Sequence, residues 1–507
     1  MKRTTLALTV SAAMLTGSAF ATPITFMPGN LVVSRTVYTG AASSVTVGQT
    51  LPGGGTAVAD GTYPNVFKNE KPDPSFGITS PIFVDQLTTS GTLVNSVNLT
   101  AAAAAQGVNL STSFPSKSEL AINRSTDGTS LTFMSYIAPV NTLDVSNSNT
   151  PGHVDSTNPV SLVYQRAVSQ ISADGTLQVT PVNSYSGNNG RAAILDNANN
   201  QYFMVGNGGN GSGIEPAAIV NSTGVQLATL GGSPSTIAVG KQQGVAGSST
   251  GYQFGYSVTE NGYVADKSGK DDNFRGETIF NNTLYVTKGS GSNGINSVYQ
   301  VGATGTLPTA DTAASTNISI LPGFNTALAK TATSGPNPFG LWFADDHTLY
   351  VADEGDGVAA DAATSQYAGL EKWTFNGTQW NLDYTLQTGL NLGALYSVGD
   401  YFPTATDGLR NITGMVNGDG TVTIFGVTST VSGSTDQGAD PNELVSITDS
   451  LSSTSLPTDE SFTTLYSAGY GEALRGVALA PVPEPATLAI FGFGLFGIAA
   501  GRRKRKL

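Results

Sequence analysis

In RGETIFNNTLYVTKG (275–289) and FGLWFADDHTLYVADEG (339–355), a β-prone run, a short polar turn and a second β-prone run follow one another. The turns use Asn and Asp, which tolerate the positive φ angles of tight hairpins. The same pattern recurs in SELAINRSTDGTSLTFMSY (118–136), RAAILDNANNQYFMVGN (191–207) and LRNITGMVNGDGTVTIFGVT (409–428). Recurrence of one hairpin along a chain predicts a repeated β architecture.

A second hairpin type alternates with the first. Its copies are expected at 82–97, 167–180, 217–230, 297–308, 369–382 and 443–456. One hairpin of each type gives a unit of four strands, and four-stranded units repeated around an axis make a β-propeller. A β-sandwich array or a β-solenoid is the alternative. Trp342, Trp373 and Trp380 lie in strand patterns and are expected in the core.

The two ends of the predicted repeat region complement each other. LRGVALAP (474–481) supplies only the first strand of a sixth unit, and NLVVSRTVYTG (30–40) can supply its partner. Joining both chain ends in one blade closes a propeller ring. The fold class is therefore all-β, a propeller of six four-stranded blades, with GYQFGYSVTENGYVADKSG (251–269) as the place where a seventh hairpin could lie. GLWFADDHTLYVAD resembles blades of NHL and quinoprotein-like propellers, a likeness that implies no single activity.

The first 21 residues have the order of a secretory signal peptide. Lys2 and Arg3 precede the apolar stretch 6–15, and Ala19-Phe20-Ala21 offers small residues at a cleavage site. A buried N-terminal helix would not need this order. We therefore expect a signal helix at 1–21 and a mature chain that begins at Thr22.

The C-terminal segment 481–507 combines three elements in a fixed order. Pro483-Glu484-Pro485 precedes an apolar run at 486–501, and the basic tail Arg502, Arg503, Lys504, Arg505 and Lys506 follows. The run is somewhat shorter than the roughly 17–25 residues of a transmembrane helix, and Arg and Lys side chains can extend its reach. Basic residues stay on the cytoplasmic side. A C-terminal transmembrane helix is expected, with residues 22–480 as a propeller ectodomain outside the inner membrane.

This ending resembles the PEP-CTERM domain, the sorting signal that exosortases recognise in Gram-negative bacteria, many of which make exopolysaccharide. The resemblance implies cleavage near Pro483-Glu484-Pro485 and transfer to the cell surface or extracellular matrix, with exosortase and the inner membrane as transient partners. A plain tail anchor is the alternative. The resemblance leaves the function of the ectodomain open.

Composition excludes several kinds of function. Without the two end segments, the chain keeps 16 basic residues against 35 acidic ones, a net charge of about −19 that repels nucleic acid. Cysteine is absent, so thiol nucleophiles, redox dithiols and cysteine-based zinc sites are ruled out. Histidine occurs only at 153 and 347, both in polar turns, which is typical of solvated loop residues.

An acidic loop follows the fourth copy of the first hairpin. Asp353, Glu354 and Asp356 lie in VADEGDGVAAD, and clustered carboxylates on glycine-rich loops can bind Ca²⁺. The spacing does not match an EF-hand, and solvated turn residues are the alternative. Calcium is the one cofactor that the sequence indicates.

Arginine recurs at the start of the first strand of four repeats, at Arg191, Arg275, Arg410 and Arg475. In a propeller this strand is innermost, so the four side chains would form part of a ring at one mouth of the channel. Guanidinium groups suit an acidic glycan or another anionic ligand. Alternatively, each arginine pairs with a carboxylate of the next blade and holds the ring together.

The sequence therefore predicts an exported surface or matrix protein that binds glycan or a partner protein without catalysis. Exopolysaccharide and surface proteins are the expected partners. The alternative is a calcium-dependent propeller enzyme, such as a phosphoester hydrolase, a lactonase or a polysaccharide lyase. Convergent carboxylates around a metal would favour the enzyme, and a salt-bridged channel would favour the binding protein.

Overall fold

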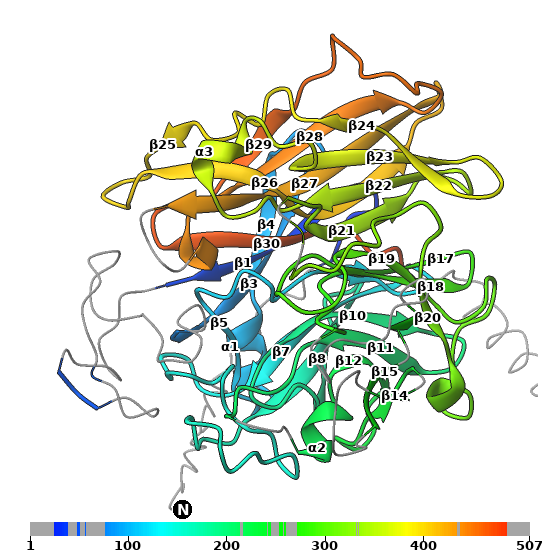
Figure 1. Cartoon of the computed structure of the whole chain (residues 1–507). Coiled ribbons are helices and arrows are strands. Elements are labelled where there is room, and N and C mark those ends of the chain that lie inside the picture. The colour runs from blue at the N-terminus through cyan, green and yellow to red at the C-terminus, as the bar shows by residue number, and fades with distance from the viewer. Residues whose placement is uncertain are drawn as a thin grey trace, which may run out of the picture.

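A computed structural model describes residues 25–38, 48–50, 56, 77–212, 216–240, 242–244, 253–256, 258–259, 271–330, 332, 334–432 and 437–483. Strands dominate these ranges, and six sheets stand around a common centre as a six-bladed β-propeller (Figure 1). The α-helices that the structure describes are short: α1 (Leu99–Ala104), α2 (Ala217–Val220) and α3 (Ala359–Ala362).

The blades are numbered here in chain order, with the innermost strand first. Blade 1 contains β30 (Glu472–Leu479), β1 (Leu31–Val37), β3 (Ile82–Leu87) and β4 (Leu93–Asn98). Blade 2 contains β6 (Asn123–Arg124), β7 (Ser130–Ile137), β8 (Gln165–Ser172) and β9 (Leu177–Val182), with β5 (Leu110–Ser113) and β2 (Thr79–Ser80) added through β7. Blade 3 contains β10 (Gly190–Asp196), β11 (Gln201–Gly206), β12 (Gly224–Thr229) and β13 (Ile237–Ala238).

Blade 4 contains β17 (Glu277–Phe280), β18 (Thr283–Lys288), β19 (Ser297–Val301) and β20 (Ile318–Ile320), with β16 (Val258–Thr259) beside β20. Blade 5 contains β21 (Pro338–Phe343), β22 (Thr348–Asp353), β23 (Gly369–Phe375) and β24 (Trp380–Leu386). Blade 6 contains β26 (Thr404–Val416), β27 (Thr421–Ser432), β28 (Glu443–Ser450) and β29 (Thr463–Ser467), preceded by β25 (Leu395–Tyr396).

The predicted ring closure is confirmed. The antiparallel pair β1 and β30 runs from Leu31 opposite Leu479 to Val37 opposite Glu472, so the chain ends share blade 1. Figure 1 shows β1, at the blue end of the colour scale, beside β30 at the red end. The last strand is innermost in blade 1, and the first strands of the chain pair outside it. Neither terminal strand can therefore separate from blade 1 without opening the ring.

Three copies of the second hairpin type were predicted with the wrong strands. Residues 217–220 form helix α2, and the outer strand of blade 3 is β13. In blades 4 and 6 the outer strand comes later than predicted, at β20 and β29, because longer connections precede it. An outer strand pairs on one side only, so its sequence signal is weak and its loop length varies.

A seventh blade is absent from the described part of the chain. Within the stretch 251–269, β15 (Gln253–Tyr256) pairs with β14 (Gln242–Gly244), and β16 lies parallel to β20 of blade 4. The predicted signal helix at 1–21 and the apolar run at 486–501 fall outside the described residues. Among the residues that are described, no helix has the length and hydropathy of a membrane span.

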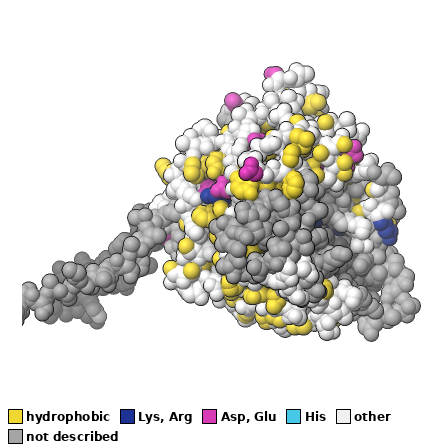
Figure 2. Space-filling view, turned by 90° about the vertical axis from the view of Figure 1, so that its left-hand side faces the viewer, with side chains coloured by type: hydrophobic (Ala, Val, Ile, Leu, Met, Phe, Trp, Pro, Cys, Tyr) yellow, Lys and Arg dark blue, Asp and Glu magenta, His cyan; other side chains and the backbone are white. Residues whose placement is uncertain are grey.

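Aromatic and aliphatic side chains fill the spaces between blades. Between blades 4 and 5, the ring of Trp373 stacks on Phe324 with centroids 3.9 Å apart, and Trp380 meets Phe343 edge-on at 5.8 Å. Trp373 and Trp380 are buried as predicted, but Trp342 is only half-buried. On the face in Figure 2, acidic side chains are scattered over the described surface and basic ones are rarer, as the composition predicts.

The innermost strands approach one another closely near the middle of the channel. A Cβ atom at Gly340 would lie 2.5 Å from the carbonyl oxygen of Arg410 in blade 6, and one at Gly476 would lie 2.5 Å from the backbone nitrogen of Ile122 in blade 2. No side chain fits at such distances, so glycine is required here for contact between blades. This narrow layer separates the two ends of the channel.

Candidate functional site

The four predicted arginines lie in innermost strands or, for Arg275, just before one, and gather at one end of the channel. Their exposed fractions are 2% for Arg191, 8% for Arg275, 3% for Arg410 and 3% for Arg475. A guanidinium that is buried this far needs hydrogen-bond partners within the protein. The partners show what occupies this end of the channel.

Residues 114–119, which follow β5, cross the channel end and are called the plug segment here. Nη2 of Arg475 donates to the carbonyl oxygen of Phe114 at 2.5 Å, and Nη1 of Arg275 donates to the hydroxyl of Ser118. Nδ2 of Asn189 donates to the hydroxyl of Ser116 at 3.1 Å. One segment of blade 2 therefore contacts blades 1, 3 and 4, as a plug across the channel does.

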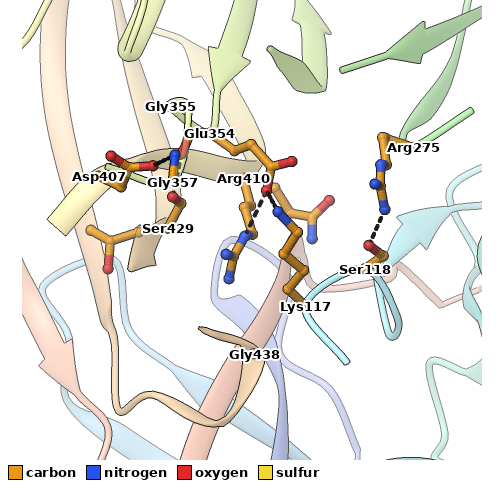
Figure 3. Close-up of polar contacts among 12 residues, drawn as sticks. Lys117, Ser118, Arg275, Glu354, Gly355, Gly357, Asp407, Arg410, Ser429 and Gly438 are labelled. Atoms are coloured by element: carbon orange, nitrogen blue, oxygen red, sulfur yellow. Dashed lines mark hydrogen bonds and ion pairs between the residues drawn. The ribbon is translucent and has the colours of Figure 1, made fainter. Parts of the chain in front are cut away.

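An ion-pair cluster joins the plug segment to blades 5 and 6. Oε2 of Glu354 lies 3.1 Å from Nζ of Lys117 and 3.2 Å from Nε of Arg410 (Figure 3). Burial raises the pKa of Glu354, but the charges of Lys117, Arg410 and Arg275 outweigh burial and lower this pKa to about 2. Glu354 is thus a carboxylate at neutral pH, and it holds the plug segment electrostatically.

The other arginines reach across blade boundaries through neutral partners. Nη1 of Arg191 donates to the carbonyl oxygen of Phe274 at 2.6 Å and to the side chain of Asn273, both just before blade 4. Nη2 of Arg475 also donates to the carbonyl oxygen of Gly438 in blade 6 at 2.5 Å. Arg410 pairs with a carboxylate of the adjacent blade, Glu354, as the structural alternative predicts. The bonds described here for Arg191, Arg275 and Arg475 go to carbonyl, amide or hydroxyl oxygens.

The acidic loop does not gather its three carboxylates at one point. Oδ1 of Asp353 accepts from the backbone N–H of Gly355 at 2.9 Å, and Oδ2 accepts from that of Asn337 at 2.5 Å. Burial raises the pKa of Asp353 to about 7. Asp356 is exposed and accepts from the N–H of Val358 at 2.9 Å.

Calcium binding at the acidic loop stays a prediction. The oxygen atoms of Asp353 and Glu354 already accept hydrogen bonds or pair with cations, so Ca²⁺ would have to displace those partners. In the part of the chain that the structure describes, no group of three or more His, Asp or Glu side chains is placed to hold a metal.

The opposite end of the channel opens as a funnel of about 570 Å³. All six blades line it near the turns of their first hairpins. Its uncharged polar side chains are Asn123, Ser125, Thr126, Thr278, Asn281, Asn282 and Thr413. Half-buried Trp342 adds an aromatic surface, and Gly414 makes room for the ring, because a Cβ there would lie 2.7 Å from it.

The funnel narrows to a cavity of about 20 Å³ at the middle of the channel. Ile122, Asn123, Leu341 and Ile412 line both spaces, so the two adjoin. Glu277 lines the cavity with an exposed fraction of 3%, and neither carboxyl oxygen has a hydrogen-bond partner among the described residues. Burial raises the pKa of Glu277 well above its usual value, which favours the neutral, protonated carboxyl.

Both described chain ends leave from the funnel side of the propeller. The backbone N–H of Val482 donates to the carbonyl oxygen of Gly128 at 2.9 Å, and Gly128 lines the funnel. At the other end, the N–H of Phe26 donates to the carbonyl oxygen of Ala173 at 2.9 Å, in the turn between β8 and β9. The C-terminal segment therefore starts at the rim of the funnel.

Sequence reasoning missed the plug segment and Glu277. The plug segment precedes the first strand of a repeat and carries no motif of its own. Glu277 could have been found from the sequence. It lies two positions after Arg275 in a strand that was predicted to be innermost, and residues of such a strand are buried. An uncompensated buried carboxyl is uncommon and marks a place to search for function.

Comparison with known proteins identifies the C-terminus. Residues 481–506 match the PEP-CTERM protein-sorting motif, as the sequence predicted. No curated protein matches the chain. The motif implies an exported protein that exosortase processes close to the membrane.

Solved structures resemble the propeller at low identity. A protein from Lactobacillus plantarum shares 11% identity over 80% of this chain and 98% of its own, with a TM-score of 0.34. The parainfluenza virus 5 hemagglutinin-neuraminidase shares 11% over 79% and 84%, with a TM-score of 0.30. A polysaccharide lyase of family PL25, an ulvan lyase, shares 12% over 83% and 94%, with a TM-score of 0.29. At these scores the likeness carries no argument about function.

Proposed function

We propose that this chain is an exosortase-sorted surface or matrix protein whose propeller binds a glycan or a partner protein without catalysis. The sorting motif at 481–506 supports export and processing near the membrane. The open funnel supports binding, because a concave site that several blades line can enclose a ligand. The plugged arginine end acts as structural support in this proposal.

The observation that carries the proposal is the junction between the propeller and the sorting motif. Strand β30 ends at Leu479, and the backbone of Ala480 still bonds to Asn30 of the N-terminal segment at 2.8 Å. Cleavage near Pro483-Glu484-Pro485 would therefore cut the chain just after the last strand and leave all six blades paired. A closed ring that ends next to the cleavage region suits a protein that works after its release.

A cell-based experiment tests the proposal. The full chain is produced in a bacterium that has an exosortase, alongside a variant with Pro483, Glu484 and Pro485 all changed to Ala. We expect the first to lose its C-terminal segment and to become accessible to external protease, and the variant to stay uncut in the inner membrane fraction. Equal processing of both, or retention of both in the cytoplasm, would refute sorting.

A further inference from the structure

The funnel has the lining of a site for an uncharged polar ligand. Amide and hydroxyl side chains, such as Asn123, Thr278 and Thr413, line the funnel together with the indole of Trp342. Hydroxyl-rich ligands bind through such donors and acceptors, with their apolar faces against an aromatic ring. Its volume of about 570 Å³ lies within the range of roughly 300–1,000 Å³ that ligand sites occupy.

The charges of the funnel balance. Arg124 and Asp127 are the charged residues that line it, and Nη2 of Arg124 donates to the carbonyl oxygen of Gly128 at 3.2 Å. Elsewhere the ectodomain is strongly acidic, so a polyanion would meet repulsion on approach. A neutral ligand meets no such repulsion and brings no uncompensated charge into the funnel.

The deep end of the funnel contains a hydrogen-bonding group that needs a partner. Both oxygens of Glu277 are buried without a hydrogen-bond partner among the described residues, which is unfavourable for a polar group. A neutral carboxyl donates one hydrogen bond and accepts others, as a hydroxyl does. The cavity beside Glu277, about 20 Å³, admits a group the size of a water molecule and no more. One ligand hydroxyl fits this space.

We propose that the funnel binds a neutral saccharide, with the rings in the wide part beside Trp342 and one hydroxyl at Glu277. This inference rests on the proposed function and names the ligand class and the site. It also places binding at the channel end opposite to the arginines. The arginine end is filled by the plug segment, while the funnel is open.

The test uses the chain from Thr22 to Pro485, which keeps all six blades and lacks the apolar run, in buffer without detergent. The probes are the neutral tetrasaccharides cellotetraose, mannotetraose and maltotetraose, with tetragalacturonate as the acidic comparison, and binding is measured by calorimetry. We expect at least one neutral probe to bind with a dissociation constant below about 1 mM, which is ordinary for a weak site. Tetragalacturonate is expected to bind at least tenfold more weakly.

Two substitutions at one position separate binding from folding. Glu277→Gln keeps a hydrogen-bonding group of the same shape and is expected to bind within about threefold of the unmodified protein. Glu277→Leu removes the group and is expected to weaken binding at least tenfold. Asp419→Asn, in an exposed turn of blade 6, is the matched control with unchanged binding. Thermal melts verify that each variant is folded.

Three results would overturn the inference: no neutral probe binds below 10 mM, the acidic probe binds best, or Glu277→Leu binds like the unmodified protein while folded. Each leaves surface sorting untouched, because sorting is measured in cells by processing and protease access. Failure of sorting, in turn, would refute the proposed function without changing the calorimetry. The two proposals can therefore fail separately.

Discussion

Glu354→Gln should destabilise the propeller by about 3 kcal/mol at pH 7. A carboxyl whose pKa falls from 4.5 in the unfolded chain to about 2 in the folded protein contributes about that much at neutral pH. An independent estimate agrees, because removing one partner of a buried ion pair costs roughly 3–5 kcal/mol. The substitution leaves Arg410, which is 3% exposed, without the carboxylate that it faces.

The dependence on pH gives the prediction a second check. The folded pKa of Glu354 lies below the unfolded value, so its contribution is complete well above pH 4.5 and is lost as the pH falls toward 2. By pH 3 the difference between Glu354→Gln and the unmodified protein should shrink to about half. Urea titrations at pH 7 and pH 3 measure both values.

Asp356→Asn is the matched control for this measurement. Asp356 lies two residues further along the same acidic loop, but it is exposed, and its hydrogen bond with the N–H of Val358 is local. We expect a change within about 0.5 kcal/mol, as for most surface substitutions. A loss below 1 kcal/mol for Glu354→Gln at pH 7, or a loss that grows as the pH falls, would refute the argument that Glu354 holds the plug segment.

Three further predictions concern the ring and the acidic loop. Asp449→Asn should cost about 3–5 kcal/mol in a urea titration, because it leaves the ammonium of Lys372, 3.0 Å away and fully buried, without its counter-charge; a loss below 1 kcal/mol would contradict this. Gly340→Ala should lower the free energy of unfolding by about 1–3 kcal/mol, because the added Cβ overpacks the boundary between blades 5 and 6. Gly418→Ala, where the Cβ would have open space, should change it little. Equal effects of the two substitutions would exclude steric packing as the cause. Chelation of calcium should leave the melting temperature unchanged within about 1 °C, because the acidic loop already uses its buried oxygens; a clear fall would establish a bound metal and revive the enzyme alternative.

The sequence predicted the structural features that recur in each blade and missed those that occur once in the chain. Hairpins of the first type recur with turn residues at fixed places, and the complementary end strands identified the closed ring. The four arginines recur once in each of four repeats and are all buried, while a role in ligand binding stays a prediction. The plug segment lies between repeats, and its contacts join residues more than 150 positions apart, such as Ser118 and Arg275. No local pattern encodes such a contact.

The same limit explains the errors about individual side chains. Trp342 looks like a core residue by strand alternation, yet the channel beside an innermost strand leaves it half-buried. Calcium binding at the acidic loop stays a prediction, but the sequence did not show that Glu354 faces two cationic side chains from other blades. Burial along a strand follows from periodicity, while the partner of a charge depends on which blades meet.

The position of the C-terminal segment leads to a last prediction about access to the funnel. Val482 is bonded at the rim, and the apolar run begins four residues later at Ala486, a reach of at most about 14 Å for an extended chain. The headgroup layer takes about 5–8 Å of that distance. If the apolar run anchors the protein in a membrane, as the sequence predicts, the funnel would face the lipid at close range.

Release should uncover the funnel. We expect the protein anchored in liposomes to bind the neutral tetrasaccharides at least tenfold more weakly than the protein released by cleavage. A flexible Gly/Ser insert of 20 residues after Val482 spans roughly 25 Å on average, enough to move the funnel away from the headgroups, and should restore binding without cleavage. Equal affinity of the anchored and released forms, measured by calorimetry on the same preparations, would show that the membrane does not cover the site. Restoration by the insert would instead mean that the short connection at the rim keeps this propeller from binding until its sorting segment is removed.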